Sequence, residues 1–112
     1  MSEPRISTDI YVSATIRTAA KEGVPITVIR RGDLSSGSII LKINLLNGTA
    51  RVLIEARYSD AGMWIPATAS EIVEEGEADA YMNRQADIDP DAWLIEIEDK
   101  KGRIWFSGNT AP

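Results

Sequence analysis

Two arginines followed by a glycine and an aspartate form the segment best suited to bind an anion. Guanidinium groups hold a carboxylate or phosphate through paired hydrogen bonds, and the N–H groups of a turn can add to them. The same segment, Arg30-Arg31-Gly32-Asp33, also has a structural interpretation, in which Asp33 caps the turn and one arginine pairs with acidic residues elsewhere. Both interpretations stay open, so Arg30, Arg31 and Asp33 are binding candidates.

A pair of glutamates offers carboxylates at a spacing known from acid–base chemistry. Glu96 and Glu98 alternate in a predicted strand and so share a face, about 7 Å apart, a range that suits glycoside hydrolysis. Alternating glutamates more often form the solvated face of a strand, and the sequence indicates no apolar cleft to raise either pKa. We therefore predict no catalytic residue, and keep Glu96 and Glu98 as binding candidates.

A calcium-loop pattern is incomplete. Asp87, Asp89, Asp91 and Glu98 fall at positions 1, 3, 5 and 12 of such a loop. However, Ala92 replaces the glycine required at the sixth position, and a proline lies inside the loop. No glycine-rich phosphate loop or dinucleotide motif is present. The sequence therefore predicts no metal site and no cofactor.

The chain lacks two side chains that are common in catalysis. It has no cysteine and no histidine, which removes thiolate chemistry and the commonest general base. Enzymatic activity is therefore less favoured than binding. The three tryptophans could instead contribute aromatic binding surface. Trp93 occupies an inward-facing position in the alternating pattern of its predicted strand and is expected in the core, while Trp64 and Trp105 lie on short, peripheral predicted strands and are binding candidates.

Charge is distributed unevenly. The net charge is −5, but residues 71–99 hold eleven acids against one arginine. Such a segment argues against nucleic acid as a partner and is either a solvated helix face or a surface for a basic partner. The N-terminus lacks a signal-peptide pattern, and no apolar run is long enough to span a membrane. We expect a cytoplasmic protein with no membrane partner.

The pattern of elements predicts an α+β fold in one domain, residues 1–112, with an ordered core over about 8–106 and frayed ends. The expected order is a helix, three or four hairpin-linked strands, a helix, and one or two strands. We expect a single, mostly antiparallel sheet of four to six strands with both helices on one face. The predicted helices are 9–22 and 76 or 77 to 86, and the predicted strands are 25–31, 39–46, 49–57, 63–65, 93–98 and 104–106. The stretch 67–75 is assigned neither to helix nor to loop.

Asn47-Gly48 predicts a hairpin with a two-residue loop, because a type I′ turn needs positive φ at both central residues. In that register Leu46 pairs with Thr49 and Ile43 with Val52. Ile39, Leu41, Ile43, Leu45, Val52 and Ile54 then share one face with two alanines, and Lys42, Arg51 and Glu55 lie on the other.

Three segments resemble a known family. They are Asp9-Ile10-Tyr11-Val12 opening a helix, Arg30-Arg31-Gly32-Asp33 followed by Gly37 and an aliphatic strand, and the run from Asp89 to Asp99. Together they resemble the bacterial domain of unknown function 1491 family over about residues 8–104. The resemblance implies a short, single-domain cytoplasmic protein, and it supplies no activity and no catalytic residue.

The leading functional hypothesis is a non-enzymatic binding or accessory module that acts through protein–protein contact, with self-association through a sheet edge as a variant. The alternative is a small anionic-ligand-binding module, or a weak enzyme, that uses the loop of Arg30 and Arg31. A pocket joining that loop to Trp64 or Trp105 would favour a ligand, whereas an open edge or flat patch would favour a protein partner.

Overall fold

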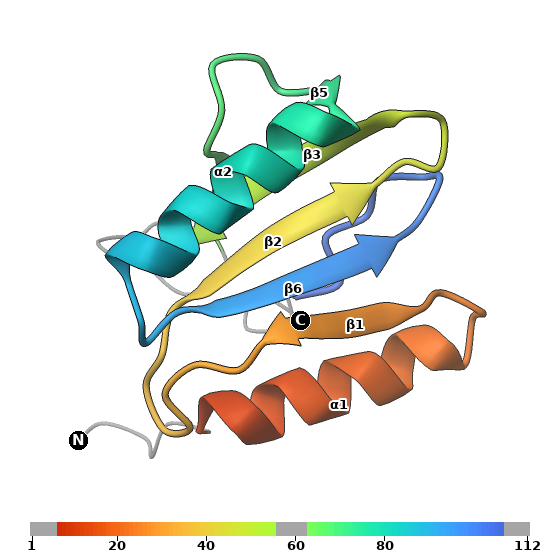
Figure 1. The fold of residues 1–112 in the computed structure, drawn as a ribbon. Helices are drawn as coiled ribbons and strands as arrows, with labels where there is room; N and C mark the ends of the chain where they lie inside the picture. Colours follow the sequence, from red (N-terminus) through yellow and green to blue (C-terminus); the bar gives the residue numbers. More distant parts are fainter. Residues whose placement is uncertain (1–6, 56–62, 107–112) are drawn as a thin grey trace.

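Two helices and six strands build the described part of the chain, residues 7–55 and 63–106 of a computed structural model (Figure 1). The elements are α1 (Thr8–Ala20), β1 (Ile26–Arg30), β2 (Ile39–Asn44), β3 (Thr49–Glu55), β4 (Trp64–Pro66), β5 (Val73–Glu74), α2 (Glu75–Ile88) and β6 (Trp93–Glu98). The predicted turn at 58–62, the predicted end of the third strand and both chain ends lie outside the described residues. Neither described helix is long and apolar enough to cross a membrane.

The strands form one open sheet in the order β1-β6-β2-β3-β4, with β5 also paired to β3. All pairs are antiparallel except β2 with β6, which run parallel. This confirms the α+β class and the mostly antiparallel sheet. The last strand lies between β1 and β2, so the first two strands do not form the hairpin that we predicted.

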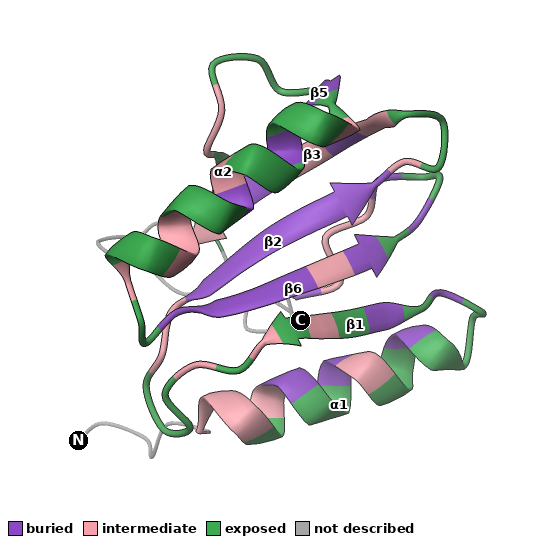
Figure 2. Cartoon of the chain, viewed as in Figure 1, coloured by how far each residue is buried: buried purple, intermediate pink, exposed green. Residues whose placement is uncertain are grey.

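The helices cover opposite faces of the sheet, and our prediction that they share one face was wrong. Val12 and Ala19 of α1 pack with Leu41, Ile43 and their neighbours in one core cluster. Helix α2 packs against the other side of the same strands, where Ala78 and Met82 form a second cluster with Ile40, Val52 and Leu94. Figure 2 shows the reason: β2 is buried along its whole length. A strand with two apolar faces needs a cover on each.

The β2–β3 hairpin has a register one residue away from the predicted one. Leu45, not Leu46, faces Thr49, whose carbonyl accepts the Leu45 N–H at 3.0 Å. The loop is therefore one residue longer than a type I′ turn, and Leu46 takes a φ of 63° within it. Arg51 consequently faces Ile43 on the α1 side, and Lys42 faces Val52 under α2.

Two further segments bear on the predicted secondary structure: one differs from the prediction, and the other had been left unassigned. Residues 104–106 do not form a strand, because Trp105 has a φ of 63° and breaks the extended backbone. The unassigned stretch 67–75 contains no helical turn before Glu75; it ends in the short strand β5, which pairs with the start of β3. Among the predicted core residues of β6, Trp93, Ile95 and Ile97 are buried as expected.

Candidate functional site

Arg30 binds backbone carbonyls at the junction of α2 and β6. Its Nη1 donates to the Ala86 carbonyl at 2.6 Å, and its Nη2 donates to the carbonyls of Asp89 and Ala92 at 2.6 and 2.7 Å. A bulge between Val28 and Arg30 turns this arginine toward the α2 side of the sheet. The last carbonyls of a helix lack partners within the helix and carry partial negative charge, so Arg30 caps α2 with a full positive charge.

Asp33 caps the turn that follows. One of its carboxylate oxygens accepts the backbone N–H groups of Ser36 and Ser35 at 2.9 and 3.2 Å, together with both serine hydroxyls. These bonds, above all that from the Ser36 N–H, lower the pKa of Asp33 below its ordinary value. The Asp33 carbonyl accepts the indole N–H of buried Trp93 at 2.8 Å, and Arg31 lies exposed over the Trp93 ring.

The three segments that carry the family resemblance meet at this corner of the fold. The Asp33 N–H donates to the Asp91 carbonyl at 2.9 Å, and the Thr8 hydroxyl at the start of α1 donates to the Gly37 carbonyl at 3.1 Å. A Cβ atom on Gly32 or on Gly37 would collide with the backbone at Asp91, so both positions require glycine. Residues in the segments that resemble the family thus hold these three segments together in the fold.

The two tryptophan candidates are held by different hydrogen-bond acceptors. The indole N–H of Trp64 donates to the Phe106 carbonyl at 3.2 Å. That of Trp105 donates to Asp99 at 2.9 Å, which holds the side chain in place despite the unusual backbone angle. The Arg103 guanidinium lies 4.6 Å from the centre of the Trp105 ring and also binds Asp99, through Nε at 2.8 Å.

An open pocket of about 590 Å³ lies beside Trp105. It is lined by Glu22, Arg51, Gly102, Arg103, Ile104 and Trp105. The lining includes neither Arg30 nor Arg31, so the structure does not bring the predicted arginine loop and Trp105 together in this pocket. The arginines that accompany Trp105 are instead Arg51 and Arg103.

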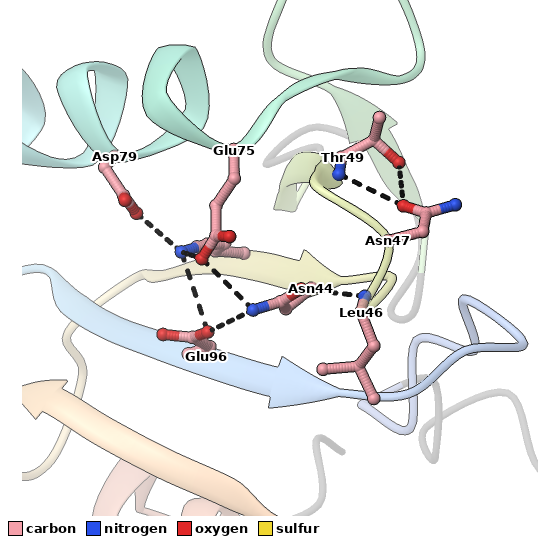
Figure 3. Close-up of polar contacts among 8 residues, drawn as sticks. Asn44, Leu46, Asn47, Thr49, Glu75, Asp79 and Glu96 are labelled. Atoms are coloured by element: carbon pink, nitrogen blue, oxygen red, sulfur yellow. Dashed lines mark hydrogen bonds and ion pairs between the residues drawn. The ribbon is translucent and has the colours of Figure 1, made fainter.

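A buried lysine lies between α2 and the sheet, surrounded by carboxylates (Figure 3). The Lys42 side chain is 3% exposed, and its Nζ lies 2.6 Å from Asp79, 2.8 Å from Glu75 and 3.6 Å from Glu96. The Asn44 amide donates to Glu75 and to Glu96, both at 3.1 Å. We call the four charged residues the Lys42 cluster. Burial by itself lowers the pKa of Lys42, but the hydrogen bonds to Asp79 and Glu75 outweigh it and raise the pKa above its ordinary value, so the ammonium stays charged and is no nucleophile.

Sequence reasoning placed Lys42 on a solvated face and so missed this cluster. The available signal was a lone lysine inside a continuous aliphatic strand, which is the pattern of a strand buried on both sides. Of the two predicted glutamates, Glu96 is half-buried in the cluster, whereas Glu98 is exposed. The described residues contain no group of three or more side chains arranged to hold a metal ion.

Fold and side chains together define a small α+β domain with the Lys42 cluster on one side of its sheet and a pocket with two arginines on the other. The chain belongs to the family described as "Protein of unknown function (DUF1491)", whose model matches residues 6–107. Two solved structures of a DUF1491 family protein from Caulobacter crescentus, one crystal and one NMR structure, are 42% and 41% identical. Both align with a TM-score of 0.77, over 91% and 92% of this chain and 94% of theirs.

A more distant structure, protein Atu0922 from A. tumefaciens, is 27% identical, with a TM-score of 0.68 over 85% of this chain and 86% of that one. No curated protein matches the chain significantly. The family and the fold are therefore established, and the relatives supply no activity.

Proposed function

We propose that this protein is a cytoplasmic, non-enzymatic binding module that contacts a basic segment of a partner protein through α2 and β6. The observation that carries the proposal is the Lys42 cluster: three carboxylates converge on one ammonium and leave a surplus of two negative charges there. Asp79 is 54% exposed, and Glu98 lies exposed on the same face of β6 as Glu96. We call Glu75, Asp79, Glu96 and Glu98 the acidic surface.

The acidic surface is a better candidate than a sheet edge. Strand β1 has no partner along its outer side among the described residues, but Pro25 precedes it and a bulge interrupts it. At the other edge, β4 is only three residues long and ends in Pro66. Short strands, prolines and bulges are the devices by which proteins prevent edge pairing. An acidic patch, by contrast, steers a basic partner at long range and excludes acidic ones.

The experiment is a titration of the ¹⁵N-labelled protein with a ten-residue arginine peptide, followed by NMR. We compare two double variants of equal charge change: Asp79→Asn with Glu98→Gln on the acidic surface, and Glu22→Gln with Glu55→Gln on the α1 side. If the proposal holds, shifts map to α2 and β6, and only the first double variant weakens binding, by about tenfold. Equal weakening in both would show attraction by net charge alone and would refute a localised site. Light scattering of the free protein tests the self-association variant.

A further inference from the structure

Arg51 carries a positive charge that the described residues leave without a counter-ion. It is half-buried on β3, and within the described part its Nη1 donates one hydrogen bond, to the Gly102 carbonyl at 2.6 Å. Its Nε is buried and finds no acceptor there. The cations that do form ion pairs among these residues, Lys42 and Arg103, have at least two carboxylates each, and Arg51 has none. A partly buried charge without a partner is costly in a folded protein, and here it faces a pocket.

Gly102 leaves space in the pocket beside the Arg51 guanidinium. Gly102 forms part of its wall with a φ of 68°, and a Cβ there would come within 3.2 Å of Leu45 and 3.7 Å of the Arg51 guanidinium. Glycine therefore lets the backbone turn while keeping the space beside Arg51 open. The volume of about 590 Å³ is in the range of small-molecule sites.

The rest of the lining selects the kind of ligand. Ile104 and Trp105 provide apolar and aromatic surface beside the two arginines. Arg103 is already bound to Asp99 at 2.8 Å and lies 3.4 Å from Glu22, so Arg51 is the cation of the lining that is available to a ligand. One available positive charge, with Glu22 nearby, suits a monoanion better than a phosphate dianion, which Glu22 would repel.

We propose that this pocket binds a small organic carboxylate with an apolar or aromatic ring, in which Arg51 holds the carboxylate and Ile104 and Trp105 contact the ring. The site lies on the α1 side of the sheet, away from the acidic surface. It uses different arginines from the loop that the sequence suggested. Ligand binding here and partner binding at the acidic surface are therefore independent, and either can fail without the other.

The test is an NMR titration with sodium benzoate, phenyl phosphate and the neutral isostere benzamide. We expect benzoate to shift the Trp105 indole N–H and the Gly102 amide, benzamide to bind at least about tenfold more weakly, and phenyl phosphate to bind no better than benzoate. Arg51→Met, which keeps the aliphatic stem, should raise the benzoate Kd at least about tenfold. Arg84→Met, on α2, is the matched control and should leave the Kd unchanged.

Four results would overturn the proposal. Equal binding of benzoate and benzamide by the wild type would show that no charge is recognised, and this comparison requires no variant to fold. Tighter binding of phenyl phosphate than of benzoate would show that the pocket prefers a phosphate to a carboxylate. Unchanged benzoate affinity in a folded Arg51→Met protein, or benzoate shifts confined to other residues, would remove Arg51 from the site.

Discussion

The Nζ of Lys42 lies 2.6 Å from Oδ1 of Asp79, joining the centre of the sheet to the second turn of α2. The two groups differ in environment, because the lysine side chain is 3% exposed and the aspartate 54%. The buried cation depends on its partners for solvation, whereas the carboxylates can also be solvated by water. Removing different members of the Lys42 cluster should therefore lower the free energy of unfolding by unequal amounts.

Asp79→Asn should cost about 1 kcal/mol of unfolding free energy, because Lys42 keeps Glu75 and Glu96. Lys42→Met should cost about 3 kcal/mol, because three carboxylates then face one another without a cation. Urea denaturation of both variants measures the difference. A smaller loss for Lys42→Met than for Asp79→Asn would contradict the expectation that the cluster depends most on its buried cation.

The Lys42 cluster also predicts how stability changes at alkaline pH. Since the pKa of Lys42 is raised in the folded protein, its contribution is complete below the ordinary lysine pKa and is lost as pH rises through the folded value. The stability gap between wild type and Lys42→Met should therefore be constant near neutrality and shrink only above about pH 10.5. Urea midpoints at pH 7, 9 and 11 check this; a gap that closes by pH 9 would contradict it.

Arg30 and Arg31 should behave very differently although they are adjacent. Arg30→Met leaves three carbonyls at the junction of α2 and β6 without the guanidinium donor and should cost about 3 kcal/mol. Arg31→Met removes one exposed contact with the Trp93 ring and should cost no more than about 1 kcal/mol. Thermal unfolding of the matched pair decides the matter. Equal losses would mean that the carbonyl contacts of Arg30 add nothing to stability.

The environment of Asp99 predicts that the stability of the protein falls at acidic pH. Burial alone would raise its pKa, but hydrogen bonds from Arg103, Trp105 and the Lys101 N–H lower it to about 2. A carboxylate whose pKa is lowered by folding stabilises the protein fully at pH values above its pKa in the unfolded chain. This contribution is lost as the pH falls through its pKa in the folded protein. Asp99→Asn should therefore cost about 2 kcal/mol at pH 7, and the difference from wild type should disappear between about pH 4 and pH 2. A pH-independent difference would locate the effect in packing instead.

Local patterns in the sequence predicted most elements but not how they pair. Both helices and the strand from Trp93 to Glu98 follow from periodicity and end signals. The insertion of β6 between β1 and β2 depends on contacts far apart in the chain, which no local pattern records. Likewise, the alternation used to set the hairpin register assumes that one face is wet. Because β2 is buried on both faces, alternation could not distinguish one register from the other.

The candidate site was predictable only in part, for a related reason. The role of Asp33 as a turn cap could be predicted from its neighbours in the sequence, and in the structure its carboxylate accepts the Ser36 N–H. The pocket at Arg51 could not be found, because the face on which Arg51 lies depends on the register. The Lys42 cluster could not be found, because no local pattern shows that α2 covers the second face of β2. The predicted register put Lys42 and Arg51 on the same face. The shift of one residue moved Arg51 to the α1 side, whereas Lys42 kept its face, which α2 covers.

The hairpin loop that sets this register contains a residue under strain. Leu46 is 51% exposed and has a φ of 63°, a region that favours glycine. Leu46→Gly should therefore stabilise the protein by about 0.5–1 kcal/mol. Gly48 has a φ of 89°, and a Cβ added there would meet no atom within 4 Å, so Gly48→Ala should destabilise the protein by about 1 kcal/mol through backbone strain alone. Urea denaturation of the two variants should give shifts of opposite sign, and a destabilising Leu46→Gly would show that the exposed leucine has a packing role in the loop.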